Sequence, residues 1–342
     1  MGVTKISWTA TVDENGVTHP GYTANFWWGC MKVSPGCANC YAETLAHRYN
    51  KSIWGPAATT EREYKKLIWK ELPKWNKRAW LEGVRRRVFV QSMADFFEDH
   101  PQVRQWRIDA LRLMLACEYL DFQVLTKRPE NILPMLEEAG ESLLKTGHNA
   151  AGVTLLRWLK HGVDYAPANL WLGTSVENQE QADKRIPELL KAPARIRFLS
   201  CEPLIGPVDL TLVADVDGFE VVTDTLRGNM SIDGQVNAPV GNIDWVIAGA
   251  ESGHGARPMD LNWVRSLRDQ CQGTGVPFFF KQAILAGKKT ELPMLDGRRW
   301  AEFPDVNSGI SLDDLPRNGW ATMDRQGNIE EYDGKWDGDD GE

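Results

Sequence analysis

The feature of this 342-residue chain that most constrains its fold is a repeated order of elements. An apolar stretch of strand length is followed, about seven times, by a stretch with apolar residues at helical spacing. The strand-like stretches are residues 24–28, 86–92, 121–126, 169–175, 196–200, 243–250 and 276–281. This alternation indicates parallel strands joined by helices. We therefore expect an α/β fold, a partial (β/α) TIM-type barrel of about six to seven parallel strands with insertions.

Three segments interrupt the alternation and are expected to be insertions in a barrel that covers residues 20–285. Residues 51–85 are basic and rich in tryptophan, and Thr60 with Glu63 has the pattern of a capping box that would begin a helix. Residues 140–166 form a second insertion, and residues 203–242, rich in Gly, Asp and Thr, form a third. We expect residues 286–332 to be a C-terminal extension and the acidic residues 333–342 to be a disordered tail.

The charge of the chain is unevenly distributed. The net charge is −8, which argues against non-specific nucleic-acid binding by the whole chain. Residues 62–87, however, carry ten Lys or Arg and three Glu, a net of +7, with Trp69, Trp75 and Trp80 between them. This segment could bind DNA or a nucleotide substrate by backbone contacts and base stacking. The alternative is an amphipathic helix with a solvated basic face.

The six cysteines are few and half are clustered, which indicates a reducing compartment rather than a disulfide framework. No apolar run is long enough to cross a bilayer, and the N-terminus has no apolar stretch typical of a signal peptide. We expect a cytoplasmic protein without a membrane partner, located in the host cytoplasm if a phage encodes it.

Polar and charged side chains follow most of the strand-like stretches. In barrels of parallel strands the catalytic groups lie at the carboxyl ends of the strands. The residues at these predicted ends are Ser92, Asp95, Thr126, Lys127, Arg128, Thr174, Ser175, Glu177, Ser200, Cys201, Glu202, Glu251, Lys281 and Gln282. Charged residues are less typical of a simple solvated loop than Gly, Asp or Asn. The pattern favours an enzyme with its site on this rim.

Three basic residues on the rim are candidates for holding a substrate phosphate or carboxylate. They are Lys127, Arg128 and Lys281. The alternative is that they form salt bridges with Glu202 or Glu251 inside the barrel.

Three cysteines follow the first strand-like stretch with the spacing C-x6-C-x2-C: Cys30, Cys37 and Cys40. Three thiolates leave one coordination position open. They could hold a [4Fe–4S] cluster with one free iron, or, with His47, a structural zinc ion. A helix that begins at Cys40 would place His47 roughly 10 Å away, which favours the cluster. Zinc and unreactive thiols remain the alternatives.

A three-cysteine loop after the first strand of a partial barrel resembles the radical SAM superfamily. The usual spacing there is C-x3-C-x2-C, and the first gap of six residues is a departure. More closely, WWGC, KVSPGCANCYAE, LTKRP, LSCEPL, AGAESG and FFFKQ, in this order over roughly residues 20–305, resemble a phage- and prophage-borne three-cysteine-motif family. Members of that family are described as radical-SAM-like phage proteins.

The resemblance implies cofactors and residues for them. Cys30, Cys37 and Cys40 would hold a [4Fe–4S] cluster whose free iron binds S-adenosylmethionine (SAM). Ser92 and Asp95 would replace the family's Gly-Gly-Glu beside the methionine amino group. The remaining cofactor-binding residues implied are Thr174, Ser175 and Glu177 for ribose or carboxylate, and Ile247, Gly249 and Glu251 for adenine.

The resemblance also implies a reaction. A flavodoxin- or ferredoxin-type donor reduces the cluster, SAM is cleaved to a 5′-deoxyadenosyl radical, and the radical takes hydrogen from a substrate. Cys201 could return a hydrogen atom to a product radical. The alternative is that Cys201 acts only as a small buried apolar residue. The candidate catalytic residues are Cys201, Lys127, Glu202 and Lys281.

A phage setting suggests a modified nucleobase as substrate, in DNA hypermodification such as isomerisation of an amino-acid adduct on thymine. The alternatives are a radical SAM enzyme acting on a peptide or small metabolite, and a non-enzymatic Cys3His zinc-binding phage accessory protein.

Overall fold

A computed structural model describes residues 2–214, 221–232, 235–253, 255–305, 321–323 and 329–331. The expected acidic tail and most of the expected C-terminal extension beyond residue 305 lie outside these ranges.

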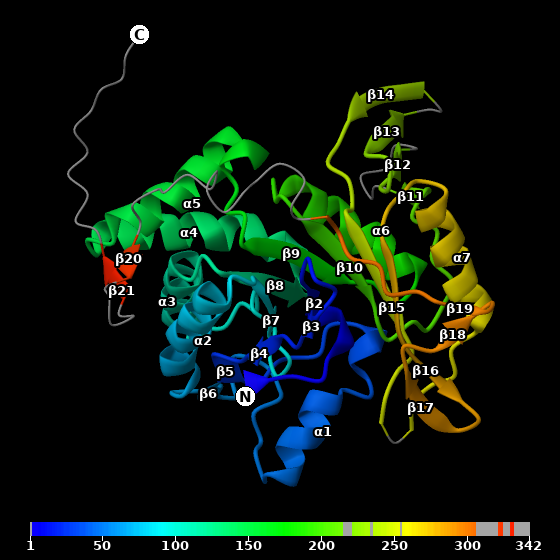
Figure 1. The fold of residues 1–342 in the computed structure, drawn as a ribbon, viewed down its shortest axis with the longest axis horizontal. Coiled ribbons are helices and arrows are strands. Elements are labelled where there is room, and N and C mark those ends of the chain that lie inside the picture. The colour runs from blue at the N-terminus through cyan, green and yellow to red at the C-terminus, as the bar shows by residue number, and fades with distance from the viewer. Residues whose placement is uncertain are drawn as a thin grey trace.

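A nine-stranded sheet forms the centre of the molecule (Figure 1). Its order is β1 (Gly2–Val3), β4 (Tyr22–Ala24), β7 (Arg86–Val90), β8 (Leu120–Thr126), β9 (Leu170–Ser175), β10 (Arg197–Cys201), β15 (Trp245–Gly249), β16 (Phe278–Leu285) and β17 (Lys288–Glu291). The seven strands from β4 to β16 are parallel and follow chain order, whereas β1 and β17 are antiparallel edge strands. The predicted α/β fold is confirmed. Within the described ranges no pairing joins β16 to β4, so a closed barrel is not observed.

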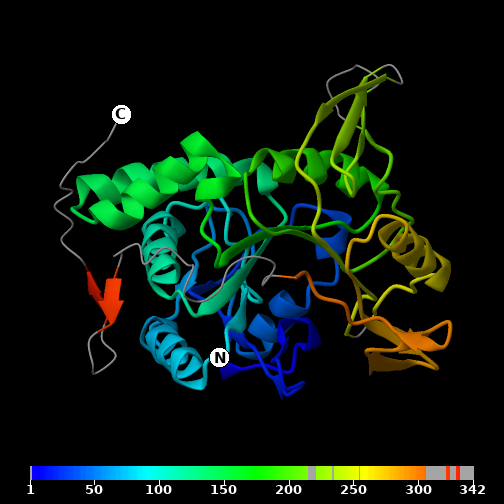
Figure 2. The same ribbon diagram turned by 45° about the horizontal axis from the view of Figure 1, so that its top comes forward.

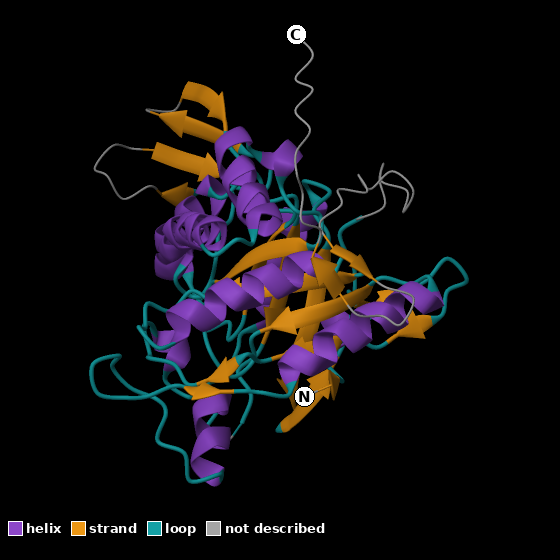
Figure 3. Ribbon diagram, turned by 90° about the vertical axis from the view of Figure 1, so that its left-hand side faces the viewer, coloured by secondary structure: helices purple, strands orange, loops and turns teal. Residues whose placement is uncertain are grey.

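Helices cover one face of this sheet (Figure 3). The helices that connect successive parallel strands include α3 (Val103–Ala116), α4 (Ile132–Lys145), α6 (Gln179–Lys191) and α7 (Leu261–Gln272). Alternate strand residues such as Phe122 and Val124 pack with them in the main core. The opposite, inner face carries an aromatic cluster that includes Trp8, Phe89 and Trp245. Because side chains alternate along a strand, one residue faces the helices and the next faces the inner side.

The first parallel strand differs from its prediction. It is β4, Tyr22–Ala24, rather than residues 24–28. Trp27–Trp28 form β5, which pairs antiparallel with β6 (Glu63–Tyr64) in a separate two-stranded sheet. Because Glu63 is in this strand, the Thr60–Glu63 pattern does not cap a helix, and α2 runs over Ile68–Glu82. Helix α1, Tyr41–Arg48, lies where it was expected.

The insertions add local structure around the sheet. Helix α5 (Asn149–His161) packs along α4, and a Cβ atom on Gly152 would lie 2.8 Å from the Gly140 carbonyl oxygen, so the two backbones touch. Strands β11 (Val213–Ala214), β12 (Val221–Asp224), β13 (Asn229–Ile232) and β14 (Gln235–Pro239) form an antiparallel sheet that projects from the body (Figure 2).

The remaining elements are short. They are η1 (Ser7–Thr9), β2 (Thr11–Val12), β3 (Thr18–His19), η2 (Pro35–Cys37), η3 (Pro129–Asn131), η4 (Val163–Tyr165), β18 (Met294–Leu295), β19 (Arg298–Arg299), β20 (Ala321–Met323) and β21 (Ile329–Glu331). In the part of the chain that the structure describes, no helix has both the length and the apolar character needed to span a membrane.

Candidate active site

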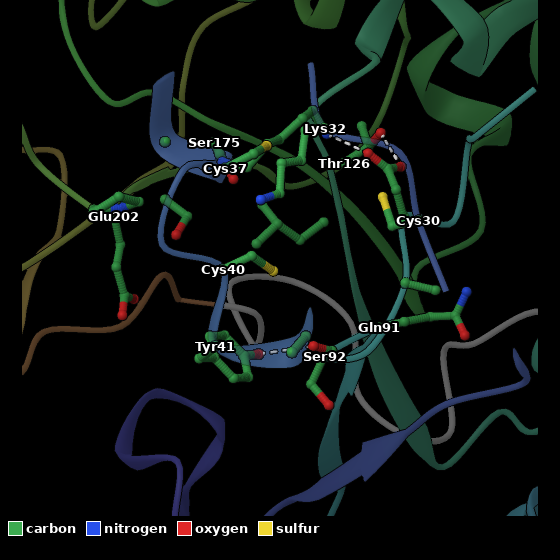
Figure 4. Close-up of a pocket in the computed structure, with 18 of the residues that line it drawn as sticks. Cys30, Lys32, Cys37, Cys40, Tyr41, Gln91, Ser92, Thr126, Ser175 and Glu202 are labelled. Atoms are coloured by element: carbon green, nitrogen blue, oxygen red, sulfur yellow. Dashed lines mark hydrogen bonds between the residues drawn. The ribbon is translucent and has the colours of Figure 1, made fainter. Parts of the chain in front are cut away.

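A cavity of about 190 Å³ lies at the carboxyl ends of the parallel strands (Figure 4). Its wall on one side is the cysteine loop, which we define as residues 30–40. Thirteen of the residues predicted from the sequence line it together: Cys30, Cys37, Cys40, Ser92, Asp95, Thr126, Lys127, Arg128, Ser175, Ser200, Glu202, Glu251 and Lys281. The sequence therefore predicted correctly that these distant positions meet at one rim.

The first support of the cysteine loop is at Met31, next to Cys30. The Met31 N–H donates to Glu98 Oε1 at 2.8 Å, and its carbonyl oxygen accepts from Arg128 Nη2 at 2.7 Å. Glu98 also forms a buried bidentate pair with Arg62, at 2.9 Å on both oxygens. Arg128 in turn donates to Asp95 at 2.8 Å. Buried charges that are paired and hydrogen-bonded in this way fix the backbone they contact.

The second support is Glu177, which follows β9. Its Oε1 accepts from Ser34 Oγ at 2.8 Å and from Lys127 Nζ at 2.5 Å, and its Oε2 accepts from Arg185 at 2.8 Å. Burial alone would raise the pKa of Glu177, but the positive charges of Lys127 and Arg185 outweigh it and lower that pKa. A side chain at Gly36 would collide with this carboxylate, so the loop passes directly over Glu177.

The third support lies at the carboxyl end of the loop. Asn39 Nδ2 donates to Glu251 Oε2 at 2.9 Å, and Glu251 is paired with Arg257. Burial would raise the pKa of Glu251, but the hydrogen bonds from Arg257 and Asn39 lower it. Tyr41, the first residue of α1, donates its hydroxyl to the Ser92 carbonyl at 2.9 Å.

These contacts change the interpretation of three predicted cofactor-binding acids. Asp95 accepts from Thr126 Oγ1 at 2.6 Å, from two backbone N–H groups and from Arg128. Glu177 and Glu251 are likewise occupied by the contacts described above. All three acids thus bind groups of the protein that hold the cysteine loop, and these contacts position the cysteines.

The structure does not bring Thr174 or Cys201 to the cavity. Both occupy strand positions that face the helices, while their neighbours Ser175 and Ser200 line the cavity. The Thr174 hydroxyl donates to the Thr126 carbonyl at 3.0 Å. Cys201 is fully buried in the main core, and burial raises the pKa of its thiol. The expectation that Cys201 points to the rim is wrong because a strand reverses its facing at each residue.

Two further predicted residues lie beside the cavity and do not line it. Ile247 is buried in the aromatic cluster of the inner face. Gly249 packs against Glu202 and Gln282, where an added Cβ atom would be 3.5 Å and 3.3 Å from their side-chain carbons. The contact with Gln282 is the tighter of the two, so a side chain at Gly249 would press on Gln282.

The three thiols of the cysteine loop are free of disulfides and partly exposed. Burial is the main cause that raises the pKa of both Cys30 and Cys40. Among the described residues, no three His, Cys, Asp or Glu side chains are placed to coordinate one metal ion. The fit to an iron–sulfur group therefore rests on the chemistry of the donors, three thiols of one loop facing one cavity.

His47, the predicted fourth zinc ligand, is on α1 with 61% of its side chain exposed. It lies 3.9 Å from Glu43 and does not line the cavity. The structure thus separates His47 from the cysteines, as the helical spacing predicted.

The basic residues that line the cavity all have carboxylate partners. Lys281 contacts both oxygens of Glu202, at 2.6 and 2.8 Å, and Gln282 donates to the same carboxylate at 3.0 Å. The others are the pairs Lys32–Glu43, Lys127–Glu177 and Arg128–Asp95. For Lys281 this is the salt bridge with Glu202 that the sequence left as the alternative to anion binding.

Part of the charge of the basic segment 62–87 is used inside the fold, whereas Lys66, Lys70, Lys74 and Arg78 are exposed. Arg62 is buried against Glu98, Arg85 pairs with Asp121, and the Arg87 guanidinium lies 4.2 Å from the Phe303 ring. Trp75 is buried and stacks on Tyr22, whereas Trp80 is half exposed. Nucleic-acid binding by this segment stays a prediction.

Sequence reasoning missed several residues that hold the loop. Glu98 and Arg62 lie outside the predicted strand ends, and Arg185 and Asn39 are within ordinary-looking helix and loop sequence. The only available signal was charge in apolar surroundings: ADFFED, with Glu98, follows a buried strand. Its partner could not be found from sequence, because Arg62 is 36 positions away.

Fold and site together define an α/β protein with a mostly parallel sheet and a cysteine-lined cavity at its strand ends. The chain belongs to the family described as "Protein of unknown function (DUF5131)", whose pattern it matches over residues 4–304. No curated protein and no solved structure matches it.

Proposed function

We propose that this chain is a radical SAM enzyme with the cysteine-lined cavity as its active site. The observation that carries the proposal is that three thiols of one loop face a cavity at the carboxyl ends of parallel strands, where four strand ends hold that loop. Parallel strands in chain order, with helices on one face and an aromatic cluster on the other, support the finer assignment of a partial (β/α) barrel.

Cys30, Cys37 and Cys40 would hold a [4Fe–4S] cluster, with SAM as its ligand and a flavodoxin- or ferredoxin-type protein as electron donor in the cytoplasm. Once bound, these groups supply a 5′-deoxyadenosyl radical that abstracts hydrogen from the substrate. The cavity residues Ser92 and Ser175 remain candidates for holding SAM.

The protein's own residues orient the substrate and exclude water. Trp8 and Phe89 are buried at the cavity wall, with Trp54 nearby, and can contact a flat ring. Lys281 and Glu202 line the same cavity, are about one-fifth exposed, at 20% and 18%, and offer a donor and an acceptor. This combination favours a nucleobase or nucleotide as substrate, for example a modified base of phage DNA.

The test is anaerobic purification, reconstitution with iron and sulfide, addition of dithionite and SAM, and measurement of 5′-deoxyadenosine by mass spectrometry. The wild-type chain should form it, Cys37→Ala should not, and Cys117→Ala, which changes a buried cysteine of the main core, should retain it. Bound zinc with intact SAM in the wild-type chain would refute the proposal.

Turnover assays with the reconstituted enzyme then distinguish between the possible substrates. Duplex DNA that carries modified pyrimidines is compared with the free nucleotides and with a peptide mixture. Product from DNA or nucleotide supports the nucleobase assignment, and product from peptide alone would replace it.

A further inference from the structure

Arg128 stands out among the buried charges of the site because it touches a cysteine. Its Nη1 lies 3.8 Å from Cys30 Sγ and 2.8 Å from Asp95 Oδ2, and its Nη2 donates to the Met31 carbonyl at 2.7 Å. The residue is 6% exposed. One planar guanidinium therefore contacts a thiol, the backbone beside that thiol and a carboxylate on another strand end.

The surroundings hold Arg128 in this position from two sides. Asp95 is itself fixed by Thr126 and by the backbone N–H of Lys127. Glu98 Oε1 lies 3.7 Å from Arg128 Nη2 and accepts the Met31 N–H. Both polar groups of the Met31 backbone are thus bound by charged, buried side chains, an arrangement that fixes the position of Cys30.

We infer that Arg128 is a positioning residue that presents Cys30 to the iron–sulfur group and raises the reduction potential of that group. The inference rests on the proposed function. A donor to a ligating sulfur, and a positive charge beside it, stabilise the more negative, reduced form of a cluster. No donor to the sulfurs of Cys37 or Cys40 among the described side chains carries a guanidinium charge, so the effect is specific to Cys30.

Two variants and one control test the inference in the full chain. Arg128→Met removes the charge and all three hydrogen bonds, and Arg128→Lys keeps the charge but cannot reach three partners at once. The control is Arg197→Met, because Arg197 is also buried but donates to the Ala192 carbonyl at the other end of β10. Each protein is reconstituted without oxygen, and iron and sulfide per chain are measured.

The second measurement is the midpoint potential, followed by electron paramagnetic resonance during a reductive titration. We expect Arg128→Met to bind less than half the wild-type iron or, where it binds iron, to have a more negative potential. Arg128→Lys should recover iron binding with an intermediate potential, and Arg197→Met should match the wild type.

Two results would overturn the inference alone: wild-type iron content and potential in Arg128→Met, or equal losses in Arg197→Met. A wild-type chain that assembles no cluster would instead overturn the proposed function, and this inference with it.

Discussion

The carboxylate of Glu177 accepts a hydrogen bond from the Ser34 hydroxyl at 2.8 Å, although 143 positions separate the two residues. Glu177 follows the fourth parallel strand, and Ser34 lies between the first two cysteines of the loop. The contact joins the cysteine loop to the end of a strand of the central sheet. Several measurable consequences come from this and the neighbouring contacts.

Glu177→Gln should destabilise the protein by about 3–5 kcal/mol, because it leaves Lys127 and Arg185 next to a neutral amide in buried surroundings. Urea unfolding monitored by tryptophan fluorescence measures the change. Glu188→Gln, in an exposed pair with Lys191, is the matched control and should change stability by less than about 1 kcal/mol. Equal effects of the two substitutions would contradict the supporting role of Glu177.

The free energy of unfolding should decrease in acid, because the carboxylates of Glu177 and Glu251 stabilise the fold only when they are charged. The pKa values of Glu177 and Glu251 are lowered in the folded chain, so their stabilisation is complete above the ordinary glutamate pKa of about 4.3. It is lost as the pH falls below that value through the folded pKa. Urea midpoints between pH 7 and pH 3 test this, and the Glu177→Gln variant should lose less stability over the same range than the wild type.

Without bound metal, the cysteines of the loop and of the core should react with iodoacetamide at different rates. Because burial raises the pKa values of Cys30 and Cys40, we expect both to react more slowly at pH 8 than a free cysteine. The core thiols Cys117, Cys201 and Cys271 should be protected until the chain unfolds. Peptide mass spectrometry over time gives the rates, and rapid labelling of Cys201 in native protein would contradict its placement.

Cys201→Ala should leave 5′-deoxyadenosine formation and product formation unchanged. The substitution removes a buried sulfur from the helix-facing core, so its expected effect is a loss of about 1 kcal/mol in stability. Thermal unfolding and turnover are measured on the same preparation. A folded variant that forms 5′-deoxyadenosine but no product would restore Cys201 as a hydrogen donor.

The sequence predicted the parallel strands well because each is a short apolar run followed by a helical pattern. Strands β8 and β9 lie within a few residues of their predicted positions. The first strand was misplaced because Trp27 and Trp28 are apolar as well, and only their pairing with Glu63–Tyr64 distinguishes them from β4. Pairing between distant segments leaves no local mark in the sequence.

The sequence predicted where the candidate site lies, but only part of what its individual residues do. Besides the three cysteines, strand ends identified ten cavity residues, since the carboxyl ends of parallel strands share one rim. The facing of Thr174 and Cys201 was missed because a shift of one residue reverses a side chain. The engagement of Glu177 and Glu251 with the loop could not be predicted, because it depends on how the cysteine loop folds back over the sheet.

The chain-order arrangement of the parallel strands has a consequence for how variants combine. Each strand end has as its spatial neighbours the ends that precede and follow it, so Arg128 contacts Asp95 on one side while Lys127 contacts Glu177 on the other. Double substitutions in adjacent strand-end loops should therefore be strongly non-additive. Those in loops two or more strands apart should add, apart from pairs that share the cysteine loop and pairs that include Glu202 of β10 with Lys281 or Gln282 of β16, which are in direct contact across β15. Apart from these exceptions, a pairwise mutational map of this rim would reproduce the strand order of the sheet.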